Sequence, residues 1–119
     1  CDVTPLVAAA NVLITDVSSV AYEAFLVDKP VVFIDCPEFF RDTVSALYGL
    51  SEAQARNELQ FNCGRHAGTV VSNLYELITA IQAAISNPSI HGAVRERLRQ
   101  ELMFNPGRAS PAAATALVE

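Results

Sequence analysis

The sequence has few of the features that identify several common classes of protein. Lys and Arg number eight against thirteen Asp and Glu, and the net charge of −5 argues against a nucleic-acid partner. The three cysteines, Cys1, Cys36 and Cys63, form no CxxC pair, so we expect neither a disulfide framework nor a zinc site, and their roles stay open. Cys63 and His66 together offer only two ligands for a metal that usually needs more. The apolar runs are short and interrupted, and they predict neither a membrane-spanning helix nor a signal peptide.

What the sequence does have is the composition of a globular domain. Hydrophobic residues make up 51% of the 119 residues and charged residues 18%. The first residue is Cys rather than Met, so we expect a piece of a longer protein, with part of any active site outside this sequence. The cysteine content fits a reducing cytoplasm.

Two apolar strands separated by one helix predict a βαβ unit. Residues 12–15 and 31–35 are short apolar runs, residues 19–27 have helical character, and Asp28-Lys29-Pro30 ends that helix. Continuous apolar strands joined in this way are typical of a buried parallel sheet. The predicted class is therefore α/β with a Rossmann-like parallel sheet, and residues 69–71 are a candidate for a further extended segment.

The rest of the chain is predicted to be mostly helical. A capping box of Ser51 and Gln54 begins one helix, and Asn73 caps another that runs to residue 86. The side chains expected to face the core from this second helix are Leu74, Leu77, Ile78, Ile81, Ala84 and Ile85. The arginines expected on a solvated face of the next helix are Arg95, Arg97 and Arg99.

The segment Thr15-Asp16-Val17-Ser18-Ser19 directly follows the first strand and opens the helix. Ligands of parallel sheets bind beyond the carboxyl ends of the strands, and a helix that begins there offers free N–H groups to a phosphate. Ser18 and Ser19 add hydroxyl donors, so we predict ligand binding at Thr15, Asp16, Ser18 and Ser19. The alternative is that Ser19 only caps the helix and Asp16 only closes a turn.

Two further features are candidates for ligand contacts. Glu23 lies in an otherwise apolar helix, so we expect a buried carboxylate that accepts hydrogen bonds from a ribose; the alternative is an exposed helix edge or an ion pair with Lys29. In the turn near the C-terminus, Gly107 permits close backbone approach, Arg108 supplies a charge for a phosphate, and Ser110 opens the last helix. The alternative there is a plain turn with a solvated arginine.

These segments resemble a known enzyme family. The run L-I-T-D-V-S-S-V-A-Y-E, followed by L-V-D-K-P-V-V-F-I-D, is similar to the C-terminal part of CDP-glycerol glycerophosphotransferases, the enzymes of teichoic-acid synthesis with a GT-B fold. The segments D-V-T-P-L-V-A-A-A-N and F-N-P-G-R-A-S also resemble that family. The resemblance implies that residues 1–119 are the C-terminal, nucleotide-donor-binding domain of such an enzyme.

The resemblance also implies particular roles and partners. Ser18 and Ser19 would bind the donor diphosphate, and Asp16 and Glu23 would lie on the donor side. The residues that it places near the donor phosphates are Gly107, Arg108 and Ser110. It implies CDP-glycerol as donor and a lipid-linked acceptor at the inner face of the cell membrane, with peripheral membrane contact through missing regions. We assign no cofactor and no metal-binding residue, and the metal requirement stays open. The catalytic residues stay unassigned, because His66 and His91 lie outside the family's histidine motifs.

Two other functions fit the same residues. The first is the donor domain of a GT-B glycosyltransferase that uses a nucleoside-diphosphate sugar, since the phosphate-binding chemistry would be the same. The second is a non-catalytic nucleotide-binding or interaction domain. In either enzymatic case we expect the piece alone to be inactive.

Overall fold

A three-stranded parallel sheet lies at the centre of the chain. The computed structural model describes residues 2–118, so Cys1 lies outside the described residues. The strands are β1 (Leu13–Thr15), β2 (Val31–Ile34) and β3 (Thr69–Val71), in the order β1-β2-β3. Leu13 is paired with Val31 and Val32 with Thr69, both in parallel register. The predicted βαβ unit is therefore confirmed, and the segment 69–71 is a third strand.

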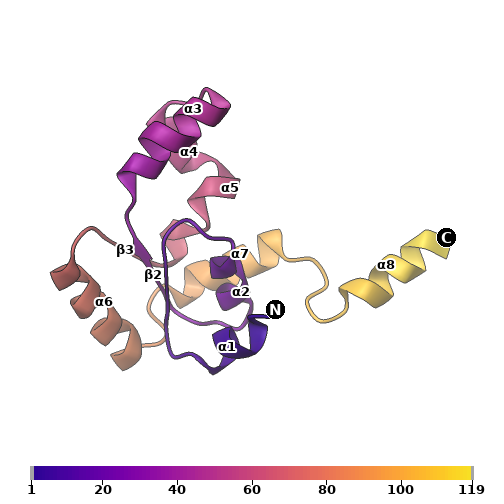
Figure 1. Ribbon diagram of the computed structural model, residues 1–119. Coiled ribbons are helices and arrows are strands. Elements are labelled where there is room, and N and C mark those ends of the chain that lie inside the picture. Colours follow the sequence, from indigo (N-terminus) through magenta and orange to yellow (C-terminus); the bar gives the residue numbers. More distant parts are fainter. Residues whose placement is uncertain (1, 119) are drawn as a thin grey trace.

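Helices connect and cover these strands (Figure 1). The α-helices are α1 (Thr4–Ala9), α2 (Val20–Leu26), α3 (Ser45–Tyr48), α4 (Glu52–Asn57), α5 (Leu59–Asn62), α6 (Leu74–Ser86), α7 (Gly92–Leu102) and α8 (Ala109–Val118). A π-helical segment η1 (Phe39–Val44) and a 3₁₀ turn η2 (Arg65–Ala67) complete the set. The predicted capping box is present, since Ser51 Oγ accepts a hydrogen bond from the Gln54 amide and Gln54 Oε1 accepts one from the Ser51 amide.

The alternation of side chains along β2 produces two cores, one on each face of the sheet. Val31 and Phe33 pack with α1, α2 and α7 in one cluster, whereas Val32 packs with Val71 and with Ala80 of α6 in another. Successive strand residues point to opposite faces, so a strand buried on both sides needs no polar residue. The result is a sheet between two helical layers, consistent with part of a Rossmann-like domain.

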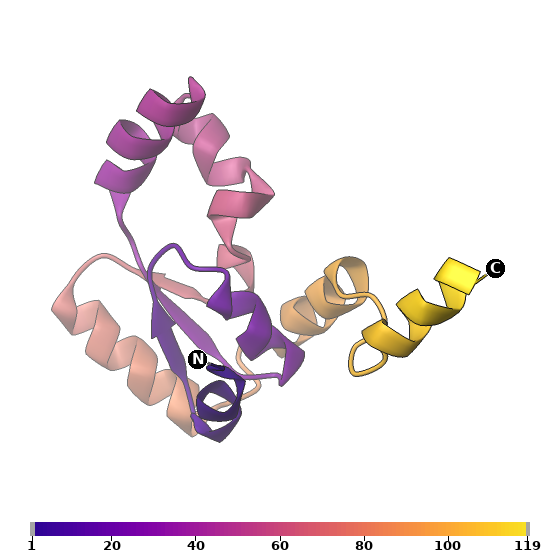
Figure 2. The same cartoon turned by 45° about the vertical axis from the view of Figure 1, so that its right-hand side comes forward.

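Residues 39–62 form a helical arm beyond the sheet (Figures 1 and 2). This arm comprises η1, α3, α4 and α5, and it leaves the sheet after β2 and returns before β3. It has a small core of its own, with Phe40, Val44, Ala55 and Phe61 buried. Val17, in the loop after β1, packs against both this core and the main one. The arm therefore rests on the loop that the sequence singles out.

Two predictions about the later helices are wrong in part. In α6, Ala84 is buried as predicted and Leu77 and Ile81 are half-buried, but Leu74, Ile78 and Ile85 are exposed, and Ala80, outside the predicted set, is buried. The helix meets the sheet along a narrow line of small residues, so the larger aliphatic side chains on either side of that line stay partly or largely uncovered. In α7, Arg95 is only 1% exposed, not solvated. No helix within residues 2–118 is long and apolar enough to cross a bilayer.

Candidate binding site at the carboxyl edge of the sheet

The loops that follow the three strands meet at one edge of the sheet. Because β1, β2 and β3 are parallel, their carboxyl ends share this edge, which Figure 2 shows on the side from which the helical arm rises. Thr15 ends β1 and Asp16 follows it, Asp35 and Cys36 follow β2, and Ser72 follows β3. Ligand sites of open α/β sheets lie at such an edge. We call these loops the carboxyl edge.

The serines of the loop after β1 differ in how they contact the protein. Ser18 Oγ accepts a weak hydrogen bond from the Val20 amide, at 3.4 Å. Ser19 is the residue at the start of α2, but within residues 2–118 its hydroxyl makes no capping hydrogen bond. Ser19 and Asp16 are exposed, whereas Thr15 and Ser18 are half-buried. Ser19 therefore occupies the N-cap position of α2 without a side-chain capping bond in the described part of the chain, and its side chain is exposed.

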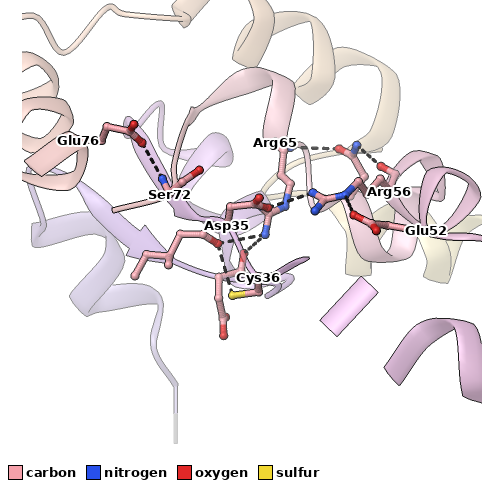
Figure 3. Close-up of polar contacts among 10 residues, drawn as sticks. Asp35, Cys36, Glu52, Arg56, Arg65, Ser72 and Glu76 are labelled. Atoms are coloured by element: carbon pink, nitrogen blue, oxygen red, sulfur yellow. Dashed lines mark hydrogen bonds and ion pairs between the residues drawn. The ribbon is translucent and has the colours of Figure 1, made fainter. Parts of the chain in front are cut away.

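Arg65 is a buried residue of this edge that the sequence analysis missed. Its guanidinium points from η2 toward Asp35 and Cys36 (Figure 3). Nη2 donates to the carbonyl oxygens of Asp16 and Ile34, both at 3.3 Å, and Nη1 lies 3.8 Å from Asp35 Oδ1. Burial lowers the pKa of Arg65, and the Asp35 carboxylate opposes that shift. Within the described residues, Nε and Nη1 make no hydrogen bond.

The local backbone explains why Arg65 points inward. Cys63 and Gly64 both have left-handed backbone conformations, with φ of 53° and 72°. A Cβ at Gly64 would lie 2.6 Å from the ring of Phe25, so only glycine permits the chain to pass this close to α2. The turn then brings η2 over the end of the sheet. The three residues Cys63-Gly64-Arg65 do not by themselves predict that the arginine points inward.

A second arginine connects the edge to the helical arm. Arg56 of α4 forms ion pairs through Nη1 with Asp35 Oδ1 at 3.0 Å and through Nε with Glu52 Oε1 at 2.9 Å (Figure 3). Its guanidinium also lies over the Phe40 ring, 4.6 Å from the centroid. The Asp35 hydrogen bond raises the pKa of Arg56 more than burial lowers it. Asp35 is thus shared by two arginines.

Glu23 is placed differently from the expectation of a buried carboxylate. It is half-buried, and its Oε2 accepts a hydrogen bond from Thr4 Oγ1 at 3.4 Å. Glu23 and Thr4 line a hollow of about 260 Å³ between α1 and α2. Glu23 lies on the side of α2 that faces Thr4 of α1, whereas Ala21, Ala24 and Phe25 are buried in the core, so their burial does not bury the carboxylate.

The structure does not bring the C-terminal candidates to the carboxyl edge. Gly107, Arg108 and Ser110 are exposed, and α8 extends away from the body of the molecule to the side (Figures 1 and 2). Arg108 lines a hollow with Asn105 and residues of α8 itself. The positive φ of Gly107, 72°, confirms the predicted turn.

Two remaining features lie outside the candidate site. A hollow of about 720 Å³ lies between α2, α5 and the end of α7, and it is lined by Tyr22, Glu58, Leu59, Gln60, Leu102 and Met103. The Tyr22 hydroxyl donates to the Leu59 carbonyl there, at 3.1 Å. Cys63 is buried and His66 exposed, and residues 2–118 contain no group of three side chains suited to hold a metal ion.

Comparison with known proteins bears on the first 49 of the 119 residues, the part of the chain that holds β1 and β2. Residues 1–49 match the family described as CDP-Glycerol:Poly(glycerophosphate) glycerophosphotransferase. This match supports a glycerophosphotransferase-family region there and suggests a transferase activity. No curated protein and no solved structure matches the chain. The matched region ends before Arg56 and Arg65. Only the structure, and not the family match, therefore assigns these two arginines to the carboxyl edge.

Proposed function

We propose that the chain is the donor-binding part of a transferase that moves glycerol phosphate from CDP-glycerol to a lipid-linked polymer acceptor. One observation carries this proposal: the family match over residues 1–49 contains the Thr-Asp-x-Ser-Ser segment, and that segment lies at the carboxyl edge of a parallel sheet. In this proposal the chain is the C-terminal Rossmann-like domain of a GT-B enzyme of teichoic-acid synthesis. The intact protein would act in the cytoplasm, at the inner face of the cell membrane.

The loop after β1 supplies the groups that the donor needs. The Ser18 and Ser19 hydroxyls donate to the diphosphate, and hydrogen bonds to charged oxygens are stronger than those between neutral groups. Asp16 and Thr15 border the same site, and Glu23 accepts from ribose hydroxyls. In the reaction, the acceptor hydroxyl attacks the phosphorus that bears glycerol, the new O–P bond forms, and the bond to CMP breaks. Donors positioned on the departing phosphate stabilise its charge, while a base elsewhere in the protein takes the acceptor proton.

The test is a donor panel with the full-length protein. CDP-glycerol labelled in its glycerol phosphate should transfer the label to a lipid-linked acceptor and release CMP, and the Ser18→Ala/Ser19→Ala double variant should lose this activity. Ser86→Ala, at the end of α6 away from the carboxyl edge, is the matched control and should retain it. Transfer from a nucleoside-diphosphate sugar instead would assign the chain to a glycosyltransferase. Failure of the full-length protein to bind any nucleotide would favour a non-catalytic interaction domain instead.

A further inference from the structure

We infer that Arg65 is the positioning residue of the donor site, holding the loop after β1 in register with the end of β2. This inference rests on the proposed function, because it takes that loop to be the donor's binding loop. Arg65 lies outside the matched residues 1–49, and it is separated from Asp16 by 49 positions in the sequence. It acts through the backbone of the loop and has no contact with the donor itself.

The contacts of Arg65 join the two loops at a single point. One nitrogen, Nη2, donates both to the carbonyl of Asp16 after β1 and to the carbonyl of Ile34 at the end of β2. The guanidinium lies 5.3 Å from the centroids of both the Phe33 and the Phe40 rings, so aromatic groups of the sheet and of the helical arm hold it from two sides. A planar, rigid donor of this kind fixes two carbonyls in space more tightly than a flexible ammonium group would.

The cost of burying this charge suggests that its role is more than stability. Arg65 is 8% exposed, and two of its nitrogens have no hydrogen bond within residues 2–118. Apolar residues of similar volume often replace a buried ion pair without loss of stability. Asp35 lies 3.8 Å away and is engaged more closely by Arg56. The two carbonyl contacts are therefore what a replacement of Arg65 would change most.

The same contacts couple the binding loop to the helical arm. Asp35 lies between Arg65 and Arg56, and Arg56 belongs to α4 of the arm. Val17 of the loop packs against the core of the arm as well as the main core. A loop held from both sides presents Ser18 and Ser19 in one geometry, and small displacements of positioned groups reduce ligand affinity strongly.

The experiment compares two buried arginines in the full-length protein. Arg65→Lys and Arg65→Met remove the paired carbonyl contacts at the carboxyl edge. Arg95→Lys and Arg95→Met are the controls, because Arg95 is also buried and bonds two carbonyls, those of Pro88 and Ile90, but lies with Asp28 at the opposite edge of the sheet. Titrations of CDP and of inorganic pyrophosphate are performed at 10 °C, and urea unfolding measures the stability of each variant.

The expected result is a loss of about tenfold or more in affinity for both probes in the Arg65 variants, with affinity within about twofold of wild type in the Arg95 variants. Arg65 variants that are folded and bind both probes like wild type would overturn the inference while leaving the proposed function intact. Arg65 variants that are both unfolded at 10 °C would assign Arg65 to the folding of the whole chain and would also overturn it. A wild-type protein that binds neither probe would overturn the proposed function and this inference together.

Discussion

Replacing Arg95 by methionine should lower the free energy of unfolding by about 2–4 kcal/mol. Arg95 is fully buried in α7, where Nε lies 2.9 Å from Asp28 Oδ1 and Nη2 lies 2.9 Å from the Pro88 carbonyl. Nη1 donates to the Ile90 carbonyl. Methionine keeps much of the apolar volume of the side chain, so the loss falls on these hydrogen bonds.

The size of this loss in stability depends on how well water replaces arginine at each of its hydrogen-bond partners. The Asp28 side chain is 69% exposed, so water replaces the arginine there at little cost. Each of the two carbonyls loses a charged donor, and each such bond contributes roughly 1.5–3 kcal/mol, so the two together contribute roughly 3–6 kcal/mol. Partial hydration of the carbonyls in the variant reduces the expected loss to about 2–4 kcal/mol.

The matched control is Arg97→Met on the same helix. Arg97 Nε lies 3.9 Å from Glu101 and its side chain is 63% exposed, so this change should alter stability by no more than about 0.5 kcal/mol. Urea unfolding followed by circular dichroism measures both variants at one pH and salt concentration. Equal, small effects for Arg95→Met and Arg97→Met would refute the account of Arg95 as a buried anchor between α2, α7 and the preceding loop.

Two further predictions concern packing against the sheet, and urea unfolding measures both. Gly68→Ala should destabilise the protein by roughly 1–3 kcal/mol, because a Cβ there would lie 2.6 Å from the Val31 carbonyl oxygen. At Gly49 an added Cβ meets open space, so Gly49→Ala should cost only roughly 1 kcal/mol, the cost of its positive φ. A Gly68 variant no less stable than the Gly49 variant would contradict the close packing. Ala84→Leu should cost roughly 1–3 kcal/mol by overfilling the contact between α6 and the sheet, whereas Ile78→Ala, at a side chain 49% exposed, should cost less than about 1 kcal/mol. A larger loss of stability for Ile78→Ala than for Ala84→Leu would instead support the buried face of α6 that the sequence predicts.

The sequence predicts well where local chemistry decides the structure. The apolar runs around Ile14 and Val32 form strands as predicted, although Ile14 is 43% exposed. The helix between them returns the chain, so the second strand runs parallel to the first. The Ser51 capping box formed as expected, because its partners are three residues apart and no distant contact competes. The sequence also predicts Ser18 and Ser19 to follow the first strand, and the structure has both in the loop at its carboxyl end, where ligands of parallel sheets bind.

Contacts between distant segments could not be predicted in the same way. Helical spacing located an apolar stripe on α6, but the fully buried residues of this helix are Ala80 and Ala84, with Leu77 packed beside Ala80 at partial burial, and this depends on how closely the helix approaches the sheet. The sequence pattern predicts Arg95 to be one of three surface arginines. In the structure, the loop before α7 contacts its guanidinium. No local pattern in the sequence predicts the burial of Arg65, since the Asp16 carbonyl that it binds lies 49 positions earlier in the sequence.

The most direct measurement of the central claim is calorimetric titration of CDP and inorganic pyrophosphate into the full-length protein. Ser18→Ala/Ser19→Ala should weaken both ligands, since each lost hydrogen bond to a charged oxygen is worth roughly 1.5–3 kcal/mol. Glu23→Ala should weaken CDP and spare pyrophosphate, because only CDP carries a ribose. Unchanged affinity for both ligands in the double serine variant, with wild-type binding intact, would contradict the claim that the carboxyl edge of this sheet binds the donor diphosphate.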